Sequence, residues 1–352
     1  MTLYFYTLIY ILLYFSFYYN FKLSLNISLK KFEIFTSIIL IVISSFRWEV
    51  GGDWSTYLNI YDRSTLNHIS FQWSLIFELI NFLSKKLLIG IWGVNLLVSV
   101  VLFYSFYKIS KILKFDYLFI LTILFSLIYF NILMGYVRQG LCLSILILSF
   151  CYILKNKKFI SACLFLLAIL THMSVIIFLP LWIYFYRSQK LTIIILCMSI
   201  FFAVLFNYSF IFVSFREFIL KSYMISPGFN FRSIPLILNL LLFIFFYKKI
   251  FYEKSLTDSF LIYNSCLIIF LNLIVFFSGS FSSFVDRLNV FFTFYQIIII
   301  GKLFIFVRKK LKYVYIHTAT FVSFIYFFLT IAWFLYGDYS VYWLDYNFIF
   351  HP

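Results

Sequence analysis

The chain has 352 residues, of which 64% are hydrophobic and only 11% are charged. Soluble domains carry about 25% charged residues, so this composition cannot cover a water-exposed surface and excludes an ordinary soluble protein. The formal charge of +16 does not indicate a nucleic-acid-binding protein, because the lysines stand in short clusters between apolar runs. We therefore expect one all-α integral membrane domain over residues 1–352.

The apolar runs predict about twelve transmembrane helices. A helix needs about 20 apolar residues to cross roughly 30 Å of hydrocarbon. In chain order, the expected spans are 2–19, 33–46, 87–107, 117–135, 138–154, 158–171, 173–186, 191–213, 233–249, 258–277, 288–306 and 313–335. The first run has no basic segment before it, so we expect an uncleaved span rather than a signal peptide.

The lysine clusters set the orientation of these spans. With the N-terminus outside, the loops that carry eighteen of the 28 basic residues are all cytoplasmic. If segment 70–84 crossed the membrane, every later cluster would move to the outer face, so we predict a re-entrant or interfacial helix there. The short runs 158–171 and 173–186 are expected to form a hairpin with His172 at its outer tip. A single 28-residue helix is the alternative, but it would place the flanking basic clusters on opposite sides.

The arginines are distributed differently from the lysines. Under this orientation six of them lie outside, against the usual charge preference. An arginine presents a planar fork of donors that suits phosphate or carboxylate. The alternative is that these residues anchor lipid headgroups or pair with acidic side chains. The six are Arg47, Arg63, Arg138, Arg216, Arg232 and Arg287.

The first outer loop, residues 47–57, is the densest group of polar and aromatic side chains. Its two adjacent glycines permit a tight turn with positive φ, which would present Asp53 beside Trp54 and Tyr57. This combination suits a sugar, because the carboxylate accepts hydroxyl protons and the rings stack on the C–H face of a pyranose. An ordinary polar loop with interfacial aromatic anchors is the alternative.

Three later landmarks also stand out. Arg138 and Gln139 interrupt two apolar runs at the outer boundary, where a charge is costly and indicates a functional site. His172 could be a general base, a phosphate contact or a satisfied structural residue. The pair Asp286-Arg287 comes just before span 288–306 and could be a local salt bridge with no further role.

Nucleotide and metal motifs are missing from the sequence. It contains no Asp-x-Asp motif, no Walker-type glycine loop and no His-Glu-x-x-His helix. All five cysteines fall inside apolar runs at no metal-like spacing. We therefore expect neither a cofactor nor a protein-bound metal, and no cytoplasmic nucleotide-sugar donor.

The sequence RWEVGGDWSTY at residues 47–57 resembles the first-loop signature R-x(2–3)-G-x-D-(Y/W)-x-x-Y of EpsG/Wzy-type O-antigen and capsule polymerases. The resemblance continues with Gly135–Gln139, with Thr171–Ser174 and with Asp286-Arg287 ahead of a late span. It thus covers roughly residues 45–295. The doubled glycine and a tryptophan in place of the more usual tyrosine are small departures from the family pattern.

This resemblance implies a metal-independent glycosyltransferase of the bacterial inner membrane with its active site on the extracytoplasmic face. Such an enzyme joins oligosaccharide repeat units linked to undecaprenyl diphosphate into O-antigen, capsule or exopolysaccharide. The growing lipid-linked chain would be the donor and a new lipid-linked unit the acceptor. Membrane lipid and a chain-length regulator would be further partners, and no nucleic acid is implied.

The resemblance also suggests roles for the landmark residues. Asp53 or His172 would be the base, and Trp54 and Tyr57 would stack on sugar. Contacts to the pyrophosphate would come from Arg47, Arg63, Arg138, Gln139, Arg232 and Arg287.

Other functions remain open. A lipid-phosphate-dependent transferase of single sugars would also have an acidic first outer loop, and an O-antigen ligase would differ only in its acceptor. A flippase or transporter of lipid-linked oligosaccharides would share the composition and an arginine-lined cavity. It should also show internal repeats and charges near the midplane, and the sequence shows no convincing repeat.

Overall fold

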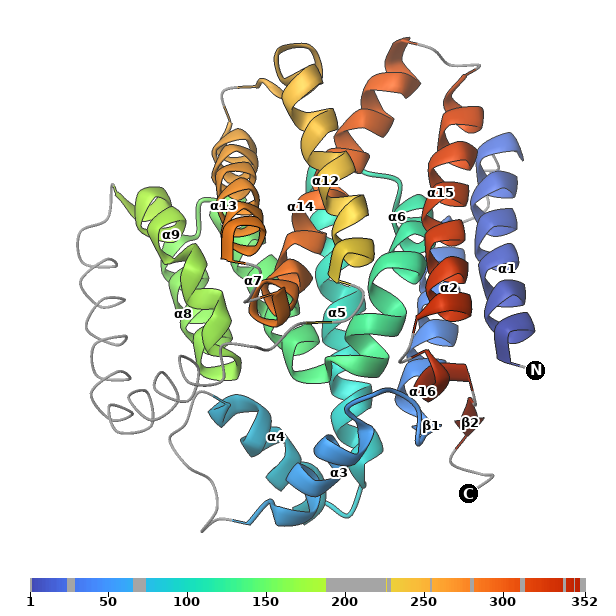
Figure 1. Ribbon diagram of the computed structural model, residues 1–352, viewed down its shortest axis with the longest axis vertical. Coiled ribbons are helices and arrows are strands. Elements are labelled where there is room, and N and C mark those ends of the chain that lie inside the picture. The colour runs from blue at the N-terminus through green and yellow to red at the C-terminus, as the bar shows by residue number, and fades with distance from the viewer. Residues whose placement is uncertain are drawn as a thin grey trace. The chain divides into compact units, whose positions relative to one another are not determined.

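A computed structural model describes residues 2–23, 29–65, 74–187, 226, 229–253, 255–278, 282–310, 314–337, 340–344 and 346–348, and these are almost entirely helical (Figure 1). By internal contacts the chain forms two compact units. Unit 1 comprises Met1–Ser64, Asn81–Gly140 and Ile297–Pro352, and unit 2 comprises Thr65–Ile80 and Leu141–Gln296. The single domain expected over 1–352 stays a prediction.

The helices and strands follow one another along the chain. They are α1 (Thr2–Leu23), α2 (Leu29–Ser45), β1 (Arg47–Trp48), α3 (Trp54–Arg63), α4 (Leu75–Lys86), α5 (Ile91–Leu113), α6 (Tyr117–Leu124), the π-helix η2 (Phe125–Gly135), α7 (Val137–Leu154), α8 (Lys158–Thr171), the 3₁₀-helix η3 (Met173–Phe178), α9 (Leu179–Tyr186), α12 (Phe229–Phe246), the π-helix η4 (Tyr247–Phe251), α13 (Leu256–Ser278), α14 (Ser282–Lys310), α15 (Tyr315–Tyr336), α16 (Val341–Leu344) and β2 (Asn347–Phe348).

Helix length and composition identify a multi-pass membrane protein. Among the described residues, six helices are long and apolar enough to cross a membrane, or seven if the bent pair of α6 and η2 counts as one span. Shorter apolar helices accompany them at Leu3–Tyr18, Phe32–Ser45, Lys158–Thr171 and Met173–Tyr186. The total of twelve stays a prediction, and the expected span 191–213 lies outside the described residues.

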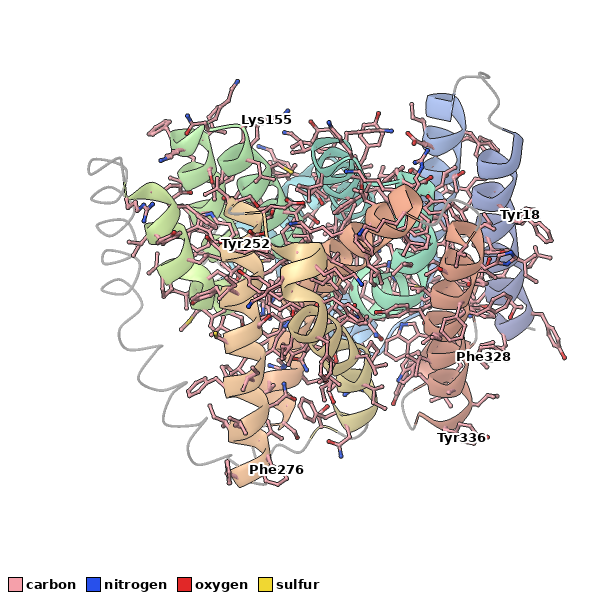
Figure 2. The ribbon with its side chains drawn as sticks, turned by 90° about the horizontal axis from the view of Figure 1, so that it is seen from above. Tyr18, Lys155, Tyr252, Phe276, Phe328 and Tyr336 are labelled. Carbon is pink, nitrogen blue, oxygen red and sulfur yellow. The ribbon has the colours of Figure 1, made fainter. Side chains whose placement is uncertain are left out.

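Large apolar side chains point away from the protein on several of these helices. Figure 2 shows Phe328 and Tyr336 projecting from α15, and Phe276 near the end of α13. The side chain of Phe276 is 79% exposed. Exposed aromatic residues on apolar helices suit contact with lipid rather than water.

Helices α2 and α5 of unit 1 pack antiparallel. The hydroxyls of Ser44 and Ser99 lie 2.8 Å apart, and Lys111 Nζ lies 2.9 Å from a carboxylate oxygen of Glu33. The end of α2 therefore lies beside the start of α5, so the segment between them leaves and returns at the same end of the pair. The twelve residues of α4 extend only about 18 Å. Both observations agree with the prediction that segment 70–84 does not cross.

The bounds expected for the third span, 87–107, are wrong. Helix α5 starts only after Gly90, because Leu88 and Gly90 take positive φ values of 57° and 82° that break the helical path. It then continues past the expected end to include Lys111, whose ammonium lies 5.1 Å from the ring centre of Tyr107. A long lysine stem can lie along an aromatic ring while its charge reaches the polar end of the helix.

The span expected over 117–135 is present as two helical pieces rather than one straight helix. Helix α6 continues as η2, and the two pieces bend by 70°. The last π-turn is closed by a bond from the Tyr136 amide to the Asn131 carbonyl, 2.7 Å long. The Thr330 hydroxyl from α15 donates to the Ser126 carbonyl at 2.9 Å. Such side-chain bonds help to satisfy backbone groups in a broken membrane helix.

Two short strands add to the otherwise helical fold. Strand β1 pairs antiparallel with β2, so that Arg47 lies opposite Phe348 and Trp48 opposite Asn347. The segment before β2 contacts the first loop as well, since the Gly51 amide donates to the Tyr342 carbonyl at 2.8 Å. The first loop and the C-terminal segment are therefore neighbours (Figure 1).

In unit 2, α7, α8 and α9 pack around Trp182. Its indole N–H donates to the Ser149 hydroxyl at 2.8 Å, and its ring stacks on Phe165 at 4.9 Å. Helix α8 ends at Thr171 and η3 begins at Met173. The break expected at His172 is therefore confirmed.

The late span begins earlier than predicted. Helix α14 starts at Ser282 rather than at 288 and has 29 residues, so Asp286 and Arg287 lie inside it. A local salt bridge between these two residues, the alternative considered from the sequence, is not found among the described residues. Asp286 pairs instead with Arg232 of α12, with 2.6 Å between the guanidinium and the carboxylate.

Candidate functional site

The turn at the start of the first loop depends on Gly51. This residue has a φ of +109°, and a Cβ added to it would lie 1.7 Å from the Met134 carbonyl oxygen. A side chain is excluded both by conformation and by space. The turn places Asp53 at the N-cap position of α3, with Trp54 as the first helical residue. This confirms the glycine turn expected from the sequence.

Arg47 is turned into the protein. Its side chain is 1% exposed, and its guanidinium donates to the carbonyls of Val50, at 3.1 Å, and Ser44. The guanidinium also lies 5.6 Å from the ring centre of Trp54. Loss of hydration lowers the pKa of Arg47 to about 10, which still leaves it charged at neutral pH. These contacts hold the loop together, and binding of pyrophosphate by Arg47 stays a prediction.

Three tryptophans cluster beside the turn. Trp48 meets Trp54 at 5.7 Å between ring centres with the planes 69° apart, and it stacks on Trp92 at 6.0 Å. Trp54 is only 6% exposed. Its indole N–H is buried and has no hydrogen-bond partner among the described residues. Sequence analysis did not single out Trp92, which lies in an apolar run 35 or more residues beyond the loop.

Tyr57 connects the first loop to the start of α7. The Arg138 amide donates to the Tyr57 hydroxyl at 3.5 Å. Burial raises the pKa of Tyr57 to about 12; the Asp53 carboxylate adds to the rise and the Arg138 charge opposes it. The phenol is therefore neutral at physiological pH, within electrostatic reach of an acid and a guanidinium. The structure thus brings Asp53, Tyr57 and Arg138 together within unit 1.

The first turn of α7 has two buried polar atoms without hydrogen bonds among the described residues. Arg138 Nε and Gln139 Oε1 are buried, and neither has a hydrogen-bond partner in the part of the chain described. Gln139 is 5% exposed. Most buried polar atoms in native proteins are hydrogen-bonded, so such atoms suggest a place for a polar ligand or water. The N-terminus of an 18-residue helix adds positive potential at the same place.

Trp343 closes the loop from the other side. A Cβ added to Gly52 or to Gly135 would lie 3.2 or 3.1 Å from its ring. Its indole N–H donates to the Phe130 carbonyl at 3.1 Å. Trp343 therefore packs between the first loop and the end of η2. The role of Trp343 is not visible in the sequence, because a tryptophan near a membrane boundary is also typical of a simple interfacial anchor.

Arg63 lies far from the Gly51 turn. It is exposed in the last turn of α3, ten residues and about 15 Å of helix from Asp53. Its contact with pyrophosphate stays a prediction.

The other candidate residues belong to unit 2. His172 precedes η3, and its Nδ1 accepts a hydrogen bond from the Ser174 amide at 3.2 Å. In the neutral ring the proton is then on Nε2, so His172 can donate a hydrogen bond to a ligand from that atom. This geometry favours a donor over a general base.

Arg232 is held by an acidic partner. Its Nε and Nη2 donate to the two carboxylate oxygens of Asp286 at 3.0 and 2.6 Å. The Ser226 hydroxyl donates to the same carboxylate at 3.0 Å. Asp286 is 8% exposed, whereas Arg287 is exposed on α14. Asp286, although it is next to Arg287 in the sequence, therefore pairs with Arg232.

Comparisons with known proteins place the chain in a family. No curated protein and no solved structure matches it. The family model of the EpsG family matches residues 30–348, which is nearly the whole chain and includes every candidate site residue above. The matched range also contains the Gly51 turn, the start of α7 and the Trp343 contact. The chain therefore belongs to the EpsG family, which includes Wzy-type polymerases.

Proposed function

We propose that this protein polymerises a polysaccharide by transferring a glycan from one undecaprenyl-diphosphate-linked chain to another lipid-linked unit. The reaction would take place on the extracytoplasmic face of the bacterial inner membrane. Membership of the EpsG family supports a polysaccharide polymerase-type role. The helices that suit a lipid environment are also what a lipid-linked substrate requires.

The junction of the first loop with α7 is the observation that carries this proposal. Asp53 and Arg138 both act on the Tyr57 phenol, and Arg138 Nε has no partner among the described residues. An acid, a neutral hydroxyl donor and a guanidinium are thus gathered within one unit. This is the set of groups that glycosyl transfer from a diphosphate leaving group calls for.

The chemical step assigns a role to each of these groups. Asp53 accepts the proton of the acceptor hydroxyl, whose oxygen forms a bond to the anomeric carbon of the donor. The bond from that carbon to the diphosphate oxygen breaks, and its electron pair leaves with the lipid diphosphate. The Arg138 guanidinium stabilises the negative charge that develops there. The transition state is oxocarbenium-like, as in glycoside hydrolysis, with a sugar hydroxyl in place of water.

Other residues of unit 1 act around this centre. Gln139 contacts the diphosphate beside Arg138, and Trp54 and Tyr57 present aromatic surface to the sugar. In unit 2, His172 would donate a hydrogen bond to the lipid-linked substrate through Nε2. Arg47 positions the loop through its two carbonyl partners.

A strain that lacks the gene tests the function. We expect lipid-linked single repeat units to accumulate and the ladder of long chains on a polysaccharide gel to disappear. A ligase would instead leave long chains on the lipid carrier, and a flippase would leave the single units on the cytoplasmic face. Normal long chains attached to the cell surface in this strain would refute the proposal.

A further inference from the structure

Helix α14 carries a stripe of polar residues on one face. The spacings of four, three, four and three residues place them within one narrow sector of the helix. All of them belong to unit 2. They are Ser282, Asp286, Asn289, Thr293 and Gln296.

Helix α12 lies against this stripe and runs parallel to α14. Near the start of both helices Arg232 pairs with Asp286, and further along Asn239 Nδ2 donates to Gln296 Oε1 at 3.3 Å. The two contacts are seven residues apart on α12, which corresponds to about 10 Å of helix. We call the five residues Arg232, Asn239, Asp286, Asn289 and Gln296 the polar seam.

Asn289 lies in the middle of the polar seam, and its side chain makes no hydrogen bond within the described part of the chain. Both its Oδ1 and its Nδ2 are buried, and neither has a partner among the described residues. A buried amide left in this state destabilises the folded protein, because both groups lose their bonds to water. If the seam served only to hold two helices together, its amides should bond across the interface, as Asn239 and Gln296 do. Asn289 offers one donor and one acceptor group that the packing does not use.

The charge of the seam limits the class of ligand. The Arg232 guanidinium is neutralised by Asp286 through two hydrogen bonds, and the other seam residues are uncharged. A diphosphate would meet no free positive charge from these residues. A hydroxyl group both donates and accepts, which matches an amide side chain with both atoms available.

We propose that the polar seam binds a sugar residue of the polysaccharide through hydroxyl contacts to Asn289. The inference rests on the proposed function for the identity of the glycan. It places a sugar-binding site in unit 2, in addition to the reaction centre of unit 1. Arg232 and Asp286 hold α12 and α14 together near the start of both helices.

The test measures binding rather than polymerisation. The probe is the repeat-unit oligosaccharide freed from its lipid by mild acid, titrated by calorimetry into the full-length protein in nanodiscs. Wild type should bind it, and Asn289→Leu should weaken binding at least tenfold. The thermal midpoint of that variant should be equal to or above that of wild type, because replacing an unpartnered buried amide by an apolar group is neutral or stabilising.

Asn272→Leu is the matched control. Asn272 is a half-buried asparagine of α13 whose amide donates to the Ile268 carbonyl of its own helix at 2.7 Å. The Asn272→Leu variant should bind the oligosaccharide as tightly as wild type does. If Asn289→Leu does not fold, Asn289→Ser keeps a hydroxyl in a shorter side chain and should still weaken binding.

Three results would overturn the sugar site. The first is that the wild-type protein does not bind the oligosaccharide. The second is that a folded Asn289 variant binds it as tightly as wild type. The third is that Asn272→Leu weakens binding as much as Asn289→Leu does. Failure of the proposed function looks different. The oligosaccharide would still bind through Asn289, but the strain without the gene would make long chains.

Discussion

A buried guanidinium needs acceptors for its donors, and the arginines of this protein obtain them in different ways. Arg47 uses the carbonyls of Ser44 and Val50, and Arg232 uses the carboxylate of Asp286. Arg138 keeps a buried Nε without a partner among the described residues. A donor that the fold does not use is available to a substrate, so Arg138 is the arginine on which we expect activity to depend most.

Arg138→Lys should therefore lose most of the polymerase activity although the charge is kept. A lysine ammonium cannot present two parallel donors to a phosphate as a guanidinium does. The measurement is the ratio of long chains to single repeat units on a gel, at matched protein amounts. Arg187→Lys is the control, because Arg187 is exposed and lies 4.7 Å from the Tyr184 ring centre. Equal tolerance at both positions would argue against recognition by a guanidinium fork.

Asp53→Asn keeps size and polarity but removes the proton acceptor. We expect the rate of polymerisation to fall by a factor of about 10² or more. Asp62→Asn, an exposed residue on the same helix, should cost far less. Both rates can be measured with purified protein and lipid-linked repeat units.

His172→Ala separates the two candidates for the base. Its Nδ1 accepts from the Ser174 amide, so we expect a hydrogen-bond donor and a loss smaller than that of Asp53→Asn. If Asp53→Asn is active and His172→Ala is inactive, the base is the histidine. If both variants polymerise normally, the proposed reaction centre is wrong.

At the scale of secondary-structure elements, the sequence located most helices and one break between them, but not the helix ends. The break at His172 follows a Thr-His step between two apolar runs, which the sequence displays. The bend between α6 and η2 is not visible in the sequence. Residues 117–135 are apolar at nearly every position, so no polar pattern marks the change from α-helix to π-helix. The inward turn of Arg47 is equally hidden, since its acceptors are backbone carbonyls.

The contact of Trp343 with the first loop could not be foreseen, because it joins elements nearly 300 residues apart. Trp343→Phe should have a mild effect, since it keeps a ring and loses one hydrogen bond worth about 1 kcal/mol. Trp343→Ala should lower both activity and the thermal midpoint strongly, because a large buried ring is removed. Tyr336→Ala, at an 85% exposed position of α15, is the control. Activity unchanged in Trp343→Ala would show that the loop does not need this support.

At the scale of the whole molecule, two contacts of unit 1 bear on the topology. The pairing of β1 with β2 places the first loop and residues 347–348 at the same end of unit 1. The ion pair of Glu33 with Lys111 places the lysine clusters near them at the opposite end. The positive-inside pattern predicts this separation of the two ends, and which end is outside stays a prediction.

Cysteine labelling tests that orientation. Single cysteines in residues 47–69 and 337–352 should react with a membrane-impermeant reagent added to intact cells, in a background without the native cysteines. A cysteine in 108–116 should react only after the membrane is opened. Labelling of the 108–116 segment from outside would show that segment 70–84 crosses after all.

The structure of the first loop also depends on contacts with residues that the ribosome adds near the end of translation. Tyr6 of α1 donates to the Trp343 carbonyl at 3.1 Å, and the Gly51 amide donates to Tyr342. A ribosome adds about 5–20 residues per second, so Asp53 waits roughly 15 to 60 seconds before Trp343 is synthesised. A nascent chain that already contains nearly all of its spans cannot yet complete the loop. Messages truncated before this tryptophan codon should therefore yield inserted but inactive protein, so that unfinished copies consume no lipid-linked sugar.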